Sequence, residues 1–336
     1  MKKSKKLLIS VFALVVTLAL ATSATFAWFS LNDKVAVGSF DVSATTGSDG
    51  LYITYGVSKS DSIFGSKVES DTIKNDDIWV TDGAEQNPKV LGYTAMTTED
   101  GIAFKDINGT EKTANTAYTP GKDATFLQFN LSFRSTTPMN IYLYSEGGAS
   151  AVTAPEGREG IEVAWPGYVA TNYYDNADGA SVPSDIAAAE GSKLNARAAN
   201  AARISFVANT VDRTTPESPA LTATTARVWN PNPKKGYYKG NMASDFNRYN
   251  DSATAAVTEQ VFAADKTVIA YTEATKETAT SIATTAAADY LKETKTPYEA
   301  VITVNIWLEG TDGDCMNDLF TDVFNIKLAF FGKATA

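Results

Sequence analysis

One acidic turn concentrates the oxygen ligands that a divalent cation needs. The stretch 309–318 reads Glu-Gly-Thr-Asp-Gly-Asp-Cys-Met-Asn-Asp and lies between two apolar runs. Ca²⁺ takes about six to eight oxygen ligands, and an Asp-x-Asp spacing can present two carboxylates from one loop. The alternative is a polar hairpin without an ion, because Asn317 replaces the glycine expected at the sixth position of an EF-hand loop. The candidate calcium ligands are Asp312, Asp314, Asn317 and Asp318.

The residue types that the chain lacks exclude several enzyme classes. It contains no His and a single Cys, Cys315. Ser-His-Asp triads, Cys-His nucleophiles and HExxH zinc helices all require His. One Cys makes neither an intramolecular disulfide nor a Cys₄ zinc site. A structural or binding protein is therefore favoured over an enzyme. Cys315 is either a buried small apolar residue or an intermolecular disulfide or reactive thiol.

Aromatic residues gather in segments that resemble turns. The main candidates are Trp165 and Tyr168, which flank a Pro-Gly pair, and Trp229, which precedes an Asn-Pro-Asn-Pro run. Exposed aromatic rings stack on sugar rings, but aromatics also anchor interfaces and fill cores. All three interpretations remain open. Paired carboxylates could hydrolyse glycosides, yet among 39 acidic residues the sequence singles out no pair.

The first 27 residues have the form of a secretory signal peptide. Four lysines precede an apolar run at 7–24, and a small-x-small site ends at Ala27. We therefore expect cleavage between Ala27 and Trp28. The alternative is an uncleaved anchor, because the apolar run is about long enough to span a bilayer. After cleavage, contact with the membrane ends.

The charge of the mature chain narrows its partners. The leader carries four basic residues and no acidic ones, so its removal changes the formal charge from −10 to −14. Such a surface repels nucleic acids and anionic lipids. It suits an extracellular protein or one whose carboxylates bind divalent cations.

Period-two alternation is the strongest structural signal in the mature chain. In 126–134, four apolar residues share one face and the polar residues share the other. Segments 300–308 and 323–330 alternate in the same way. This pattern is typical of half-buried antiparallel strands. Shorter strands are predicted at 35–44, 51–57, 78–81, 90–96, 140–144, 161–164, 204–208, 226–229 and 267–271.

Many short strands with polar turns favour an all-β fold, an antiparallel β-sandwich of jelly-roll type. Residues 28–336 are expected to form one such domain with insertions. The Ala-rich segment 184–202 predicts a short helix. Segment 251–290, in which Ala and Thr supply 21 of 40 residues, predicts a further insertion with a second helix near 281–291.

Residues 24–44 resemble the leader junction and first strand of TasA/camelysin-type proteins of Gram-positive bacteria. The shared features are a small and aromatic leader end and the motif Gly38-Ser-Phe-Asp-Val-Ser-Ala44. A Pro-Gly turn at 120–121, before the strand at 126–134, is similar too. The resemblance implies a jelly-roll fold, a dedicated signal peptidase and a role at the cell surface or in the biofilm matrix.

Some members of that family polymerise by donating their mature N-terminal strand. In this chain the apolar positions change face at Gly38, which predicts a strand with a bulge there. This strand either closes its own sheet or pairs with the open edge of a neighbouring subunit. The residues of the candidate donor strand are Val35, Val37, Phe40 and Val42.

Together these features predict a secreted structural protein of the cell surface or extracellular matrix that associates with copies of itself. The first alternative is a monomeric adhesin or carbohydrate-binding module. The second is a metallopeptidase, an activity implied by the camelysin name and disfavoured by the lack of His. No cofactor other than calcium is expected.

Overall fold

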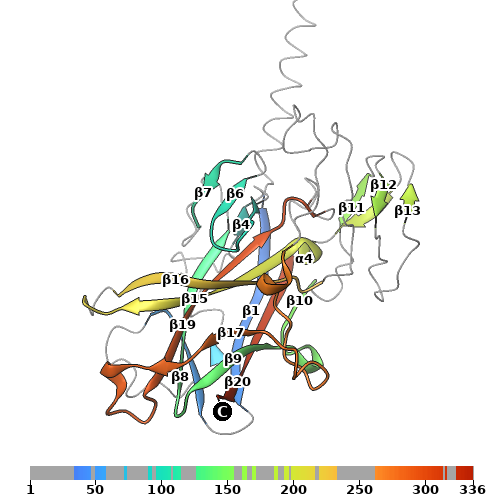
Figure 1. The fold of residues 1–336 in the computed structure, drawn as a ribbon. Helices are drawn as coiled ribbons and strands as arrows, with labels where there is room; N and C mark the ends of the chain where they lie inside the picture. The colour runs from blue at the N-terminus through green and yellow to red at the C-terminus, as the bar shows by residue number, and fades with distance from the viewer. Residues whose placement is uncertain are drawn as a thin grey trace, which may run out of the picture.

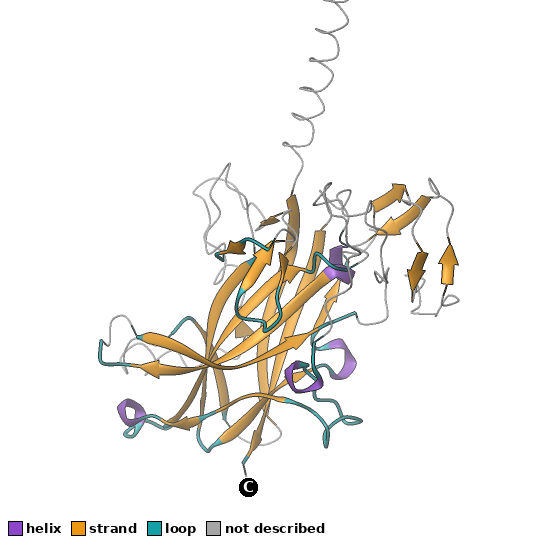
Figure 2. Cartoon of the chain, turned by 45° about the horizontal axis from the view of Figure 1, so that its top comes forward, coloured by secondary structure: helices purple, strands orange, loops and turns teal. Residues whose placement is uncertain are grey.

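The protein is all-β, and most of its strands pair in antiparallel fashion. Figure 2 shows that, among the described residues, helices are limited to short turns, including the four-residue α4 (Ala198–Ala201). The computed structural model describes residues 34–46, 50–57, 72–73, 90–92, 96–106, 109–114, 126–154, 161–164, 169–171, 185–187, 193–196, 198–215, 219–232, 262–312, 315 and 323–335.

The first sheet places the first and last strands of the described chain side by side (Figure 1). Its order is β17-β9-β20-β1-β3, with β10 paired to β20 and β4 paired to β1. β1 and β20 run parallel, whereas the other pairs in this sheet are antiparallel. The bounds are β1 (Lys34–Thr46), β3 (Thr72–Ile73), β4 (Val90–Gly92), β9 (Met139–Tyr144), β10 (Ala151–Thr153), β17 (Ser281–Thr284) and β20 (Val323–Ala334).

The second sheet is antiparallel, with the order β16-β15-β19-β8-β2 and with β18 paired to β19. Its bounds are β2 (Leu51–Tyr55), β8 (Leu127–Ser135), β15 (Ala202–Asp212), β16 (Ala220–Trp229), β18 (Ala286–Ala287) and β19 (Tyr298–Leu308). Three short strands form a smaller sheet: β5 (Met96–Thr97), β6 (Phe104–Asp106) and β7 (Glu111–Lys112). Two separate pairs are β11 (Ile161–Ala164) with β14 (Lys193–Ala196), and β12 (Val169–Thr171) with β13 (Asp185–Ala187).

The two large sheets share one hydrophobic core. The alternating apolar residues that predicted β8, β19 and β20 are buried in it, which confirms these strands. Phe133 of β8 and Phe330 of β20 meet edge to face across the core, with ring centroids 5.0 Å apart. Burial of alternate residues on both sheets drives their packing, because each buried large apolar side chain contributes roughly 1.5–3 kcal/mol.

A second, smaller core covers the opposite face of the second sheet. Trp307 of β19 is fully buried there and lies 5.0 Å from the ring of Phe104 in β6. Met96, Phe126 and Val228 complete the cluster. The face of β19 that points away from the main core is therefore covered at this end, which the sequence pattern did not predict.

The first strand follows the prediction in its extent and in its irregularity. β1 pairs with β20, and the register shifts between Val37 and Ser39, which confirms a bulge at Gly38. Val42 and Ala44 are buried in the main core. Val35, Val37 and Phe40 pair through their backbones, and their side chains lie outside the described part of the structure.

The helix predicted at 184–202 is confirmed for the single turn of α4 alone, and the helix predicted near 281–291 is wrong. Segment 184–202 contains β13, β14 and the single turn of α4, because Leu194 pairs opposite Val163 and tertiary pairing overrides the helix preference of alanine. Segment 281–291 contains β17, β18 and a three-residue 3₁₀ turn, η4 (Asp289–Leu291). The strand predicted at 267–271 is reduced to bridges at Thr267 and Tyr271.

Other predicted segments differ in length or lie outside the described residues. The strand predicted at 90–96 appears as the separate short strands β4 and β5. The strand at 78–81, the leader and the cleavage site at Ala27 and Trp28 lie outside the described residues. Within the described residues, no helix has the length and apolar character needed to cross a membrane.

Candidate functional site

The seam around β1 is the first candidate site. β1 pairs with β20 at ten positions. On its other side it pairs with β4 at three positions and with β3 at two. A long parallel contact therefore holds one edge of this strand, and short contacts hold the other. β1 ends at Thr46, five residues before β2 begins in the opposite sheet.

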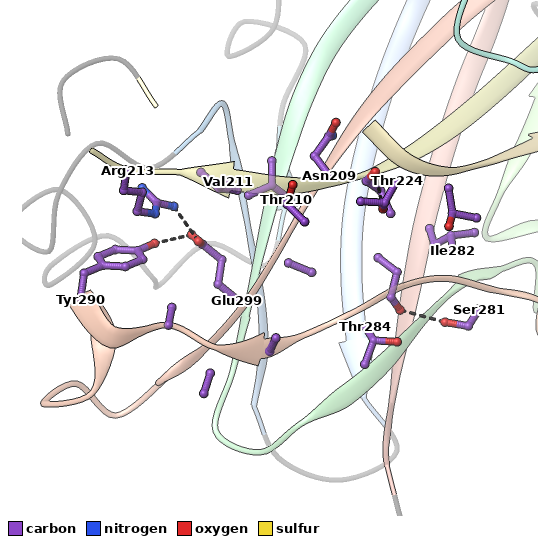
Figure 3. A pocket seen from close by; sticks show the side chains of 18 of the residues that line it. Asn209, Thr210, Val211, Arg213, Thr224, Ser281, Ile282, Thr284, Tyr290 and Glu299 are labelled. Atoms are coloured by element: carbon purple, nitrogen blue, oxygen red, sulfur yellow. Dashed lines mark hydrogen bonds and ion pairs between the residues drawn. The ribbon is translucent and has the colours of Figure 1, made fainter. Parts of the chain in front are cut away.

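A groove beside the β15–β16 hairpin is the second candidate site (Figure 3). Its volume is about 840 Å³, and its floor is the segment that contains β17, β18 and η4. β15 pairs with β19 only as far as Asn209, directly after a register shift between Ala208 and Asn209. Beyond Asn209, the described residues of β15 pair with β16 alone. β18 pairs with the start of β19 instead. The extra residue at this shift is Thr224 of β16, which lines the groove.

The walls of the groove carry small and hydroxyl-bearing side chains. Several of these hydroxyls donate to nearby acceptors, such as Thr224 to the Ala208 carbonyl at 2.9 Å and Thr284 to Asn140 Oδ1 at 2.7 Å. Their oxygens keep acceptor capacity toward the groove. The polar neutral lining residues are Asn209, Thr210, Thr224, Thr225, Ser281 and Thr284.

Four side chains from distant parts of the sequence form a cluster at one end of the groove, here called the Glu299 cluster. Arg213 Nη2 lies 2.6 Å from Glu299 Oε2, and the Tyr290 hydroxyl donates to Glu299 Oε1 at 2.5 Å. Arg134 Nη2 donates to the Tyr290 oxygen at 3.3 Å. The Arg213 guanidinium stacks 4.0 Å from the centre of the Tyr290 ring. Figure 3 shows Arg213, Tyr290 and Glu299 converging.

The electrostatics of the Glu299 cluster keep Tyr290 protonated. Burial, followed by the charge of Glu299 and the hydrogen bond to it, raises the pKa of Tyr290 to about 12, against the lowering effect of both arginines. With Tyr290 neutral, two guanidinium groups face one carboxylate. Glu299 is therefore the charged carboxylate that both arginines approach within the cluster.

Arg227 enters the groove from the edge strand β16. It lies opposite Phe206, which is buried in the main core, and residues opposite one another in an antiparallel pair share a face. Its Nε atom is buried and has no hydrogen-bond partner among the described residues. A buried guanidinium nitrogen without an acceptor is costly, so this atom marks a place where an acceptor is expected.

The described carboxylates of the acidic turn, for which a calcium site was predicted, form ion pairs and hydrogen bonds with other side chains of the protein. Asp312 is buried and forms an ion pair with Arg203 at 2.5 Å. Among the described residues, no group of three or more His, Cys, Asp and Glu side chains is arranged for a metal ion. The other predicted ligands, Asp314, Asn317 and Asp318, lie outside the described residues.

Glu309 lies beside this ion pair. The three residues Arg203, Glu309 and Asp312 are here called the Asp312 cluster. Its carboxylate accepts hydrogen bonds from Trp307 Nε1 at 3.0 Å and from the Thr311 hydroxyl at 2.8 Å. Burial raises the pKa of Glu309, while these hydrogen bonds and the charge of Arg203 lower it. Arg203 also donates to the Asn200 carbonyl at 2.8 Å. The cluster fastens the end of β19 to the start of β15.

Two other sequence candidates can be placed. Cys315 is 4% exposed and belongs to the main core, which confirms its interpretation as a buried residue. The interpretation of Trp229 as an exposed sugar-binding platform is wrong, because it lies opposite Ile204 and faces the same core. Trp165 and Tyr168 lie outside the described residues.

An aromatic group that the sequence analysis missed lies on the outer face of the first sheet. Phe331 stacks between Tyr271 and Tyr144, with ring centroids 4.4 and 5.9 Å away. Tyr142 contacts Tyr271 from β9. The signal was the alternation of Tyr142 and Tyr144 with core residues, together with an aromatic residue on each face of β20 at 330 and 331.

Comparisons with protein-family models, with curated proteins and with solved structures found no match for this chain.

Proposed function

We propose that the chain is an exported structural protein of the bacterial surface or extracellular matrix, and that it assembles by exchange of β1 between copies. The observation that carries this proposal is the position of β1 beside β20, with ten paired positions on one edge and, among the described residues, two short partners on the other. The TasA/camelysin resemblance of residues 24–44 supports the same role, together with a jelly-roll arrangement of the two sheets.

Exchange costs little per contact, because a second copy supplies the identical strand. If β1 leaves, the backbone groups of β20 lose their partners and Val42 and Ala44 leave the core. The β1 of another copy restores the same hydrogen bonds and the same burial. Such swapping is a low-cost route to assembly, and a head-to-tail contact that does not close on itself grows into a filament.

The connection between the sheets is the hinge for this exchange. Gly50 precedes β2 with φ +88°, in the left-handed region that favours glycine. A Cβ atom at this position would lie 2.9 Å from Thr136 Cγ2. The closed arrangement therefore depends on a tight glycine turn. Release of β1 lets this turn extend.

Electron microscopy of the purified chain beginning at Trp28 tests the proposal. We expect filaments that lengthen with protein concentration, and none after deletion of residues 28–44. Because the deletion could prevent folding, a second experiment adds a synthetic peptide of residues 28–46 to the intact chain. The peptide should cap growing ends and shorten the filaments, and a scrambled peptide should not. A chain that stays monomeric for days at high concentration contradicts the proposal.

A further inference from the structure

The charged residues that line the groove leave a cation, Arg227, at its β16 end. The charged residues that line it are Arg213 directly after β15, Arg227 from β16, Asp289 from η4 and Glu299 from β19. Arg213 and Glu299 neutralise each other, and Asp289 is exposed to solvent. Arg227 remains, with a buried Nε that has no acceptor among the described residues. A carboxylate fits this need, because a guanidinium fork binds it through two parallel hydrogen bonds.

The remainder of the groove suits a ligand rich in hydroxyl groups. Ser, Thr and Asn side chains donate and accept hydrogen bonds along both walls, and alanines leave room between them. Of the larger apolar lining residues, Ile282 and Val301 are 2% and 1% exposed, and Val211 is half-buried. The lining threonines Thr224, Thr225 and Thr284 are exposed, so hydroxyl groups are more accessible to a ligand than these aliphatic side chains are.

The length of the groove points to an oligomer. Arg227 lies opposite Phe206, and Arg213 of the Glu299 cluster comes seven residues after Phe206 in the sequence, directly after the end of β15. At about 3.3 Å per residue of strand, the two ends are roughly 20 Å apart.

We propose that this groove binds an acidic oligosaccharide, with a sugar carboxylate on Arg227 and the following sugar units along the hydroxyl-lined walls toward Arg213. Arg227 orients the ligand, and the Ser, Thr and Asn side chains replace the water around its hydroxyl groups. This binding activity is separate from strand exchange, since it uses β15, β16 and β17 and leaves the β1 seam untouched.

Calorimetric titration of the freshly purified chain with a galacturonic acid tetramer tests the proposal. We expect saturable binding that weakens as salt is raised. A neutral galactose tetramer should bind at least about tenfold more weakly. Arg227→Gln should weaken the binding of the acidic tetramer by about 10- to 100-fold, as expected for the loss of a charged hydrogen bond. Lys327→Gln, an exposed residue of β20, is the matched control and should change nothing.

Other results would overturn the proposal. If tetraglutamate bound as tightly as the acidic sugar, the groove would be a general carboxylate site, and the proposal that its ligand is an oligosaccharide would be rejected. Unchanged binding in Arg227→Gln, with an unchanged melting temperature, would reject Arg227 as the anchor. No heat from the acidic tetramer, together with aggregation of Arg227→Gln, would show that Arg227 only protects a sheet edge.

Discussion

β19 and β1 both lie inside a sheet, yet the structure holds them in different ways. β19 pairs antiparallel with β15 at eight positions and with β8 at nine, so long strands flank both of its edges. In the part of the chain that the structure describes, β1 has one long neighbour, β20, and two short ones, β3 and β4. Long strands therefore flank both edges of β19, whereas the described pairing of β1 is long on one edge and short on the other.

The two ends of β19 are also secured by charged side chains. Glu299, near its start, joins the Glu299 cluster, and Glu309, directly after its end, joins the Asp312 cluster. β1 contributes Val42 and Ala44 to the core through its described side chains. β19 therefore acts as the fixed centre of the protein, and β1 is the strand suited to exchange.

The largest expected effect comes from the Asp312 cluster. Arg203→Leu leaves the buried carboxylate of Asp312 without its counter-charge, and breaking such a pair costs about 3–5 kcal/mol. Urea unfolding should show this loss in the free energy of unfolding. Lys292→Leu, at an exposed position, should change it by less than about 0.5 kcal/mol. Equal free energies of unfolding for the two variants would contradict the claim that the Asp312 cluster fixes this end of β19.

The other end of β19 should show a smaller loss. Glu299→Gln removes the carboxylate that faces Arg213 and Arg134. Loss of hydrogen bonds to a charged group costs about 1.5–3 kcal/mol. Urea unfolding measures the change, and Glu293→Gln, at an exposed site, is the control. A change below about 0.5 kcal/mol would show that the cluster does not hold this end.

Hydrogen exchange compares the two strands directly. Amides of β19 should exchange only through global unfolding, whereas amides of β1 should exchange through a smaller opening. We expect protection in β1 to be at least about tenfold lower, which corresponds to about 1.4 kcal/mol. Mass spectrometry or NMR of the monomer gives both values. Equal protection in the two strands would contradict the claim that β1 is held less firmly than β19.

A further effect is the response of stability to alkaline pH. Tyr290 has a pKa of about 12 in the folded protein, above the ordinary tyrosine pKa of 10.0. Between these values the unfolded chain loses the proton and the folded chain keeps it, so stability should fall as pH rises from about 10 to 12. Tyr290→Phe should flatten this part of the thermal-unfolding profile. The same slope in the variant would contradict the assignment.

The strands were predictable where one face alone is buried. In β8, β19 and β20 the alternation of apolar and polar residues matches the main core. The pattern failed where tertiary pairing decides the local structure, as at Leu194 opposite Val163, in a segment whose alanines favour helix. It also could not predict that Arg134 and Ser132, on the polar face of β8, are buried, because the covering residues come from elsewhere in the chain.

The candidate sites, like the strands, were predictable from the sequence where local sequence decides them and unpredictable where tertiary contacts do. The acidic turn was visible because its ligands are neighbours in sequence, but its described carboxylates are bound by Arg203, Trp307 and Thr311. The Glu299 cluster was invisible, since its members lie at 134, 213, 290 and 299. The bulge at Gly38 was visible because the apolar positions change face there. Secretion, the jelly-roll order and the role in the matrix remain predictions.

A disulfide between β1 and β20 tests strand exchange most directly. Ser43 and Ala329 are register partners, and neighbouring strand positions meet the Cα spacing that a disulfide needs. Ser43→Cys with Ala329→Cys is compared with Thr210→Cys and Thr222→Cys, partners within one hairpin. Oxidised after assembly, the first pair should give ladders of covalent multimers on a non-reducing gel, and the second should give monomers. Oxidised before assembly, the first pair should prevent filaments until it is reduced. Filaments that form from the locked protein, or that contain only intrachain disulfides, would contradict strand exchange.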